Sequence, residues 1–393
     1  MTSFSRWTPW IALLLATVTW SAMAVTAVQP SRDEEVLEVL PEVTRSRPAR
    51  AAAAQVVNPA AAALQARKDI AIARQTGDTR YWGRAQAVLA PWWDRPDAPA
   101  DLAILQATVQ QGRHEFDASR KVLAATLARA PGNAQGWLNL AALERLSARY
   151  TEALGACDAV ARAGQALYAT ACRLETQSLQ GQHQPAAQGL QALIAQTPDP
   201  AQRSWLLSLM AESQERWGRD RAAAQAYTRS LELDPDLYTS IAYSDLLLRT
   251  GKTSLALQTL AALPETDAVV LRRAAAWRRL GDARWTGART VLQERAAALE
   301  RRGDDPALHG RELALAALWL DDDAPRALAL ARRNLRLQRE PLDWWVALQS
   351  AHQAKDSAAV AELESALHAA RLHDVRLLST RPANLPTALT VAN

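Results

Sequence analysis

Apolar and small side chains recur three and four positions apart along most of this chain, and this spacing is its strongest structural constraint. They form blocks of about 12–15 residues that Gly, Asp or Pro interrupt. An α-helix turns once in about 3.6 residues, so such blocks indicate amphipathic helices. Strand-like alternation is absent, and β-branched residues are sparse. The pattern therefore predicts an all-α protein built from short paired helices.

The segment 204–235 carries the pattern most completely. Ala211 and Ala223 fall where two helices would cross, and their small side chains let the two backbones approach closely. Tyr227 would fill the space beside them, and Pro235 cannot continue a helix. We therefore expect this segment to fold as one pair of antiparallel helices.

The same spacing returns in phase in four consecutive blocks, namely 134–164, 166–198, 204–235 and 237–264. These blocks resemble the tetratricopeptide repeat, which folds two antiparallel helices in about 34 residues and closes the second with a proline. The resemblance covers residues 58–264, is strongest over 100–264, and weakens to divergent helical pairs over 265–378. It implies a right-handed superhelical solenoid of stacked antiparallel helix pairs.

Residues 1–24 have the composition of a secretory signal peptide. Arg6 precedes an apolar run that is shorter than the roughly 20 residues of a membrane span, and a small-x-small pattern ends at Ala24. We expect cleavage after Ala24 and a periplasmic or secreted protein without a transmembrane segment; retention as an uncleaved anchor is the alternative. Residues 25–57 are expected to form an extended leader, and residues 379–393 a disordered tail.

The chain contains two cysteines, Cys157 and Cys172. The repeat frame places them on antiparallel neighbouring helices, at mirror positions about the turn at 162–165, where a disulfide is geometrically possible. Export to an oxidising compartment favours its formation. Closing a loop of about 15 residues would stabilise the fold by roughly 3 kcal/mol on the chain-entropy model. Two free buried thiols and a redox-active couple are the alternatives.

Charge and local motifs argue against nucleic-acid binding and against catalysis. The formal charge is +4, and acidic and basic residues alternate along the chain instead of forming basic runs. The segment 249–254 ends like a phosphate-binding loop, but Leu246 stands where that loop needs glycine. His309 and Glu312 could offer two ligands to a metal, but no second such pair exists. We therefore expect no enzyme, cofactor or metal site.

In tetratricopeptide arrays the first helix of each pair lines a concave groove, and its second and ninth positions face inward. The resemblance therefore implies a binding groove with an aromatic row, an acidic row and a basic end. The aromatic row is Tyr168, Trp205 and Tyr238, the acidic row is Glu175, Glu212 and Asp245, and the basic end is Arg272, Arg278 and Arg279. If the register is off by one residue, these rows are partly core or exposed instead.

The predicted function is that of a non-enzymatic, exported scaffold that binds an envelope or secreted protein or peptide. Aromatic anchors would supply contact area, and the carboxylates would select basic groups. Because the chain is rich in tryptophan, a factor that binds glycan or peptidoglycan is the first alternative. A hydrolase that uses His309, Glu312 and His352 is the second. The sequence leaves the oligomeric state open.

Overall fold

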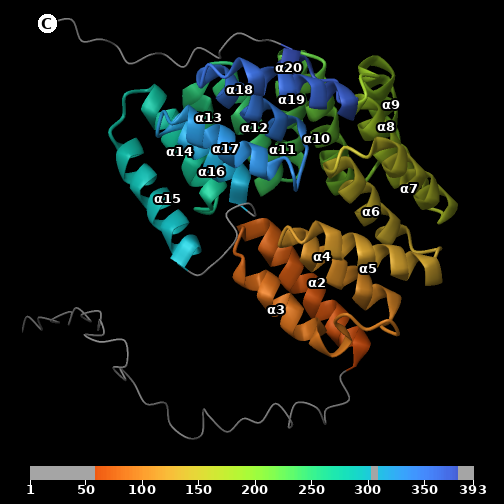
Figure 1. The fold of residues 1–393 in the computed structure, drawn as a ribbon. Coiled ribbons are helices and arrows are strands. Elements are labelled where there is room, and N and C mark those ends of the chain that lie inside the picture. The colour runs from red at the N-terminus through yellow and green to blue at the C-terminus, as the bar shows by residue number, and fades with distance from the viewer. Residues whose placement is uncertain (1–57, 302–308, 379–393) are drawn as a thin grey trace, which may run out of the picture. The chain divides into compact units, whose positions relative to one another are not determined.

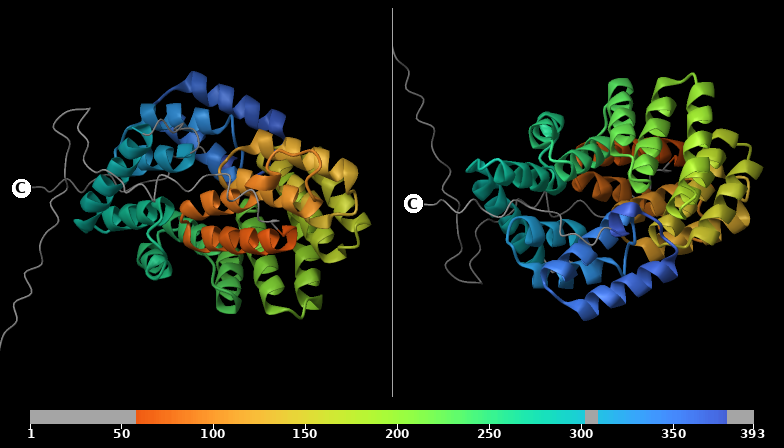
Figure 2. Two further views of the ribbon diagram at one scale, coloured as in Figure 1. Left: turned by 90° about the horizontal axis from the view of Figure 1, so that it is seen from below. Right: turned by 90° about the horizontal axis from the view of Figure 1, so that it is seen from above.

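The computed structural model describes residues 58–301 and 309–378. The predicted signal peptide at 1–24, the leader at 25–57 and the tail at 379–393 lie outside these residues. The described residues contain helices and no strand, and consecutive helices pack against each other in pairs. The prediction of an all-α solenoid of stacked helix pairs is thereby confirmed (Figures 1 and 2).

The N-terminal and central pairs are α2 (Pro59–Thr76) with α3 (Arg80–Leu89), α4 (Ala100–Gly112) with α5 (Phe116–Arg129), α6 (Ala134–Leu146) with α7 (Tyr150–Arg162), α8 (Ala166–Leu179) with α9 (His183–Gln196), α10 (Pro200–Arg216) with α11 (Asp220–Leu233), and α12 (Leu237–Arg249) with α13 (Thr253–Leu260). A short 3-10 helix, η2 (Ala90–Trp92), follows α3. The C-terminal pairs are α14 (Asp267–Arg279) with α15 (Arg284–Arg301), α16 (Gly310–Trp319) with α17 (Ala324–Asn334), and α18 (Pro341–Gln353) with α19 (Ser357–Ala370), and the short helix α20 (Val375–Leu378) follows.

The pair α10–α11 packs as the spacing in 204–235 predicts. Ala211 and Ala223 are fully buried where the two helices meet, and Tyr227 is fully buried beside them. The second helix of the pair ends at Leu233, just before Pro235. The first helix begins at Pro200, earlier than the block that the sequence indicates, because Asp199 accepts a hydrogen bond from Gln202 N and caps it.

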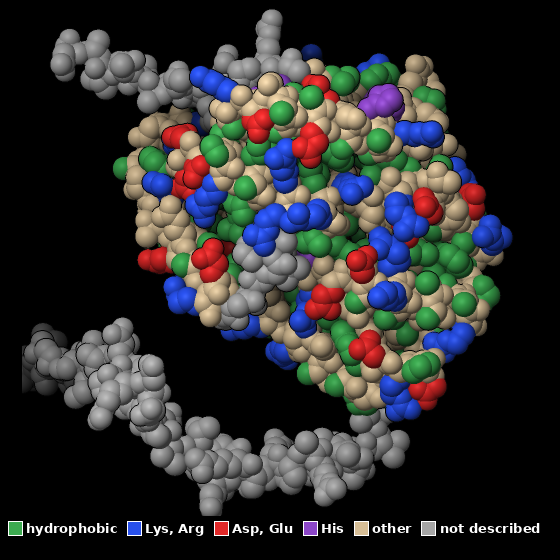
Figure 3. All heavy atoms as spheres, viewed as in Figure 1, with side chains coloured by type: hydrophobic (Ala, Val, Ile, Leu, Met, Phe, Trp, Pro, Cys, Tyr) green, Lys and Arg blue, Asp and Glu red, His purple; other side chains and the backbone are tan. Residues whose placement is uncertain are grey.

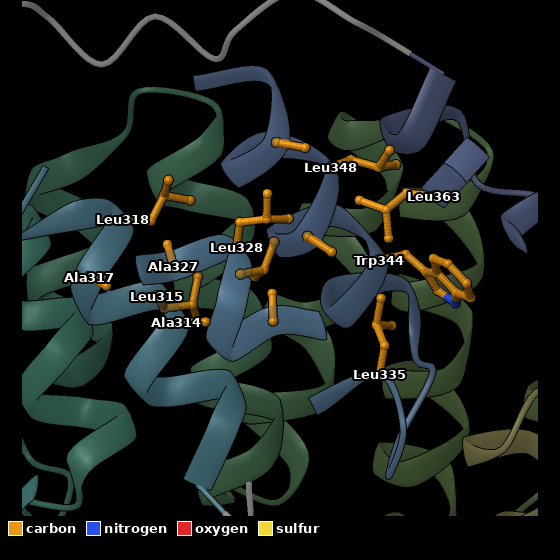
Figure 4. Close-up of a cluster of buried hydrophobic side chains, with 14 of the residues drawn as sticks. Ala314, Leu315, Ala317, Leu318, Ala327, Leu328, Leu335, Trp344, Leu348 and Leu363 are labelled. Carbon is orange, nitrogen blue, oxygen red and sulfur yellow. The ribbon is translucent and has the colours of Figure 1, made fainter. Parts of the chain in front are cut away.

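The C-terminal pairs share one hydrophobic cluster although their repeat consensus is weak. Leu315 and Leu318 of α16 and Trp344 and Leu348 of α18 belong to this cluster. Leu328 of α17 lies between the two groups, and Leu363 of α19 lies beside Leu348 (Figure 4). Burial of large apolar side chains drives this packing, and each contributes about 1.5–3 kcal/mol relative to an exposed position. The divergent pairs α16–α17 and α18–α19 therefore have a buried core, whereas α15 has no fully buried side chain.

The C-terminal region also contacts the ends of the central first helices. Two backbone hydrogen bonds make this contact, from Arg339 N to Leu146 O (2.7 Å) and from His373 N to Leu179 O (2.8 Å). A salt bridge joins Arg376 Nη1 to Glu215 Oε1 at 3.0 Å. Segments far apart in the sequence thus meet at the C-terminal ends of α6, α8 and α10. Among the described helices, none is long and apolar enough to cross a membrane.

Candidate functional site on the first helices of three central repeats

Helices α8, α10 and α12 carry the predicted aromatic row, one residue each. The rings of Tyr168 and Trp205 lie with their centroids 5.5 Å apart at an interplanar angle of 42°. Gln202 Nε2, one turn before Trp205, donates to the Tyr168 hydroxyl at 3.2 Å. Both rings are half-buried. The structure therefore brings these two members of the row into direct contact across neighbouring repeats.

Tyr238 is the open member of the aromatic row. Its side chain is 63% exposed, while its hydroxyl donates to Glu212 Oε1 at 2.8 Å. The Glu212 carboxylate, together with burial of the hydroxyl end, raises the pKa of Tyr238 well above its usual value. The hydroxyl therefore stays protonated as a donor, and the ring presents its face to water.

The acidic row lies at a uniform depth, and an arginine pairs with each member. The side chains of Glu175, Glu212 and Asp245 are 17%, 19% and 22% exposed. The ion pairs are Arg145 Nη2 with Glu175 Oε2 (2.9 Å), Arg216 Nη1 with Glu212 Oε2 (3.5 Å) and Arg272 Nη2 with Asp245 Oδ2 (2.7 Å). The protein itself therefore balances most of the negative charge of the row.

Glu212 is the least neutralised member of the acidic row. Burial, with the neighbouring carboxylates of Glu175 and Glu340, raises the pKa of Glu212 to about 7, against the opposing effects of Arg216 and Tyr238. Glu340 lies between α17 and α18, so the C-terminal region contributes charge to this site. Near neutral pH the Glu212 carboxyl is therefore divided between its neutral and ionised forms.

Two of the three arginines of the predicted basic end, Arg272 and Arg278, are engaged by carboxylates. Arg272 is 2% exposed and donates to both oxygens of Asp245 at 2.7 Å. Arg278 Nη1 donates to Asp322 Oδ1 at 3.1 Å and to the carbonyl oxygen of Trp319. These ion pairs balance the charges of Arg272 and Arg278, whereas Arg279 forms no ion pair within the described residues. A partner's contact with any of the three stays a prediction.

The sequence did not indicate two of the arginines that balance the acidic row, Arg145 and Arg216. Arg216 follows Glu212 by four residues on one helix, a spacing that could have revealed the pair. Arg145 reaches Glu175 from the preceding repeat, and no local pattern marks such a contact. Pairing of this kind depends on how two repeats stack.

The disulfide predicted between Cys157 and Cys172 is present. It joins α7 to α8, and both residues are buried in one cluster with Ala141. Arg145 Nη1 lies 3.4 Å from Cys172 Sγ, and the same guanidinium binds Glu175. The disulfide therefore fixes two helices at the edge of the acidic row.

The residues of the alternative functions lie elsewhere. His309 and Glu312 line a hollow of about 280 Å³ beside α15 and α16, whereas His352 lies on α18 and does not line it. Residues 249–254 form the turn between α12 and α13. In residues 58–301 and 309–378, no group of three or more His, Cys, Asp or Glu could hold a metal ion. The tryptophans in these ranges are all buried or half-buried.

Charge is mixed over the face of the molecule that Figure 3 presents. Side chains of both signs are interspersed there, with apolar side chains between them. The interspersion agrees with the alternation of acids and bases in the sequence.

Stacked helix pairs with short turns define a helical-repeat protein of the tetratricopeptide-like fold. No protein-family model and no curated protein matches the sequence. Three similar solved structures are Rap protein complexed with competence and sporulation factor, a tetratricopeptide repeat protein from Parabacteroides merdae, and the human IFIT1 dimer with PPP-AAAA. Their sequence identities are 10%, 13% and 13%, and their TM-scores are 0.47, 0.37 and 0.42. The matches cover 81%, 68% and 65% of this chain and 87%, 97% and 69% of those chains.

Proposed function

We propose that this chain is an exported, non-enzymatic scaffold that binds an extended segment of a protein partner, in envelope assembly or secretion. The open ring of Tyr238 is the observation that carries the proposal, since Tyr238 is the exposed member of the predicted row in which Tyr168 and Trp205 are in contact. An exposed aromatic face forgoes hydrophobic stabilisation that a bound side chain would supply. The hydrogen bond to Glu212 holds the ring in place before a partner arrives.

The acidic row suggests what the bound segment carries. Glu175 and Asp245 have arginine partners within 3.0 Å, whereas the Arg216 pair of Glu212 is longer, at 3.5 Å. A basic group of the partner would therefore bind at Glu212, beside an apolar or aromatic side chain on Tyr238. Binding such a cation would favour the ionised carboxylate and release a proton. Absence of nucleic acid among the partners stays a prediction.

Export is part of the proposal, and the disulfide supports it. Bridges between cysteines persist in oxidising compartments and are rare in the cytosol. The pair Cys157–Cys172 joins two repeats and is buried. A signal peptide over residues 1–24 would deliver the chain to such a compartment.

The experiment selects binders from a phage library of random linear peptides on protein purified from the exported fraction. N-terminal sequencing of that protein reads Val25 if the signal peptide is removed as proposed. We expect selected peptides to combine an aromatic or apolar residue with Lys or Arg. The double substitution Trp205→Ala and Tyr238→Ala should weaken their binding at least tenfold in calorimetry.

The matched control is Leu255→Ala, which removes an exposed apolar side chain from the second helix of a pair. It should leave the affinity for the selected peptides unchanged.

With a pKa of about 7 at Glu212, peptides with a basic group should bind about tenfold more weakly at pH 6 than at pH 8. Peptides that bind the folded double variant as tightly as the wild type would rule out the aromatic row as the binding site.

A further inference from the structure

A hollow of about 520 Å³ lies where the C-terminal helices face the central repeats. Its size falls within the range of about 300–1,000 Å³ that is common for small-molecule sites. Helices α12 and α14 supply Leu248 and Arg279 on one side, and α16 and α18 supply Trp319, Trp345 and Gln349 on the other. Of the aromatic and acidic rows, Asp245 alone also lines this hollow.

One wall of the hollow is apolar and aromatic. The rings of Trp319 and Trp345 meet edge to face, with their centroids 6.3 Å apart and an interplanar angle of 63°. Leu318 and Leu342 extend this wall, and Leu248 of α12 adds apolar surface on the other side. An apolar side chain of a ligand would lose contact with water here and gain dispersion contacts with the indole rings.

Two polar atoms of the residues that line the hollow, Gln349 Oε1 and Arg279 Nε, are buried and have no hydrogen-bond partner within the described residues. Gln349 is 5% exposed, and its Oε1 accepts no hydrogen bond within the described part of the chain. A buried acceptor without a donor is unfavourable, so a ligand donor there would stabilise the site. The group that Gln349 Oε1 requires is an N–H or O–H.

Arg279 supplies the positive charge of the hollow. It donates from Nη1 to the Leu248 carbonyl oxygen, its Nε has no acceptor, and within residues 58–301 and 309–378 it forms no ion pair. Arg249 and Arg376 also line the hollow, but carboxylates engage both. Burial lowers the pKa of Arg279, against the opposing effect of Asp245, and a bound anion would favour its charged form.

We propose that this hollow binds an apolar amino acid residue with an acylated amine and a free carboxylate. The carboxylate would pair with Arg279, the amide N–H would donate to Gln349 Oε1, and the side chain would lie against Trp319 and Trp345. Guanidinium and carboxylate match each other in geometry and charge. This proposal concerns a second site and does not depend on peptide binding by the aromatic row.

The test uses three probes in isothermal titration calorimetry with the full exported chain. The first is N-acetyl-phenylalanine, the second is its C-terminal amide, and the third is acetyl-Gly-Gly-Phe with a free carboxylate. We expect the acid to bind at least tenfold more tightly than the amide. Tighter binding of the tripeptide than of the single residue assigns the site to peptide C-termini, and the reverse order assigns it to free acylated amino acids.

The substitution Arg279→Gln should remove the preference for the acid while leaving affinity for the amide unchanged. Gln349→Leu should weaken both probes, because it removes the shared acceptor for the amide N–H. Arg162→Gln is the control, since Arg162 is exposed on α7 and away from the hollow. Equal binding of acid and amide to the wild type, or no binding of either at millimolar concentration, would overturn the proposal.

Discussion

At the scale of single residues, the raised pKa of Glu212 makes the stability of the fold depend on pH. It accepts a hydrogen bond from Tyr238, lies 3.5 Å from Arg216, and shares its surroundings with two other carboxylates. Burial and these carboxylates raise the pKa of Glu212 from its usual value of 4.5 to about 7. The folded state therefore holds a proton on this group that the unfolded chain releases between these two pH values.

The stabilisation from Glu212 is complete below about pH 4.5 and is lost as pH rises through about 7. The loss is on the order of 3 kcal/mol, at 1.36 kcal/mol for each pH unit. Glu212→Gln keeps an acceptor for Tyr238 but cannot ionise, so we expect the variant to lose less stability between pH 5 and pH 8. Urea titrations at the two pH values measure this difference.

The control for this measurement is Glu232→Gln, on an exposed carboxylate that makes no ion pair within the described residues. It should follow the pH dependence of the wild type. If Glu212→Gln also follows the wild type, Glu212 is ionised throughout this pH range and the assignment of its pKa is wrong.

At the scale of helical elements, most of the turns within the pairs share one geometry. The amide after the turn residue donates to a carbonyl five residues back, as in Gln182 N to Gln177 O (3.0 Å) and Lys252 N to Leu247 O (2.8 Å). The turn residue between them has a positive φ, 86° at Gly181 and 76° at Gly251. This is the Schellman geometry, in which glycine avoids the strain that a Cβ introduces.

Two glycine substitutions separate turn strain from helix propensity. Gly251→Ala should destabilise the protein by about 1 kcal/mol, because φ is +76° and no neighbouring atom lies within 4 Å of the new Cβ. Gly155→Ala, in the exposed face of α7, should stabilise it by about 0.5–1 kcal/mol. Thermal unfolding followed by circular dichroism gives both values. If the two substitutions shift the unfolding temperature in the same direction, this account of the turns is wrong.

Features that repeat locally were predictable from the sequence, and features that depend on stacking were not. The helical period places Ala211, Ala223 and Tyr227 in the core, and the repeat frame places Cys157 opposite Cys172, as the structure confirms. The hollow beside α18 combines side chains of the central repeats with those of the divergent C-terminal pairs. No period in the sequence relates such distant segments.

At the scale of the whole described solenoid, contacts between distant repeats add to those between neighbours. In a simple repeat array each unit contacts only the next, and stability is a sum of local and nearest-neighbour contributions. Here Arg376 reaches Glu215, 161 residues away in the sequence. The hydrogen bonds of Arg339 and His373 with the ends of α6 and α8 act in the same way. We therefore expect the C-terminal pairs and the central repeats to unfold together.

Arg376→Met tests this coupling. The side chain of Arg376 binds Asp374, which is 2% exposed, and Glu215, which also receives hydrogen bonds from Arg249 and Tyr227. Its loss leaves Asp374 without its cation and should lower the free energy of unfolding by about 2–3 kcal/mol. This is less than the roughly 3–5 kcal/mol expected for breaking a fully buried ion pair, because Glu215 keeps two donors.

Hydrogen–deuterium exchange measured by mass spectrometry locates the effect of this substitution. Loss of the bridge should speed amide exchange both in residues 341–378 and in α10, because the contact links the two segments. Arg162→Met, on the exposed face of α7, should change neither. If faster exchange in Arg376→Met stays within residues 371–378, the distant contacts do not couple the repeats, and the array behaves as a chain of nearest neighbours.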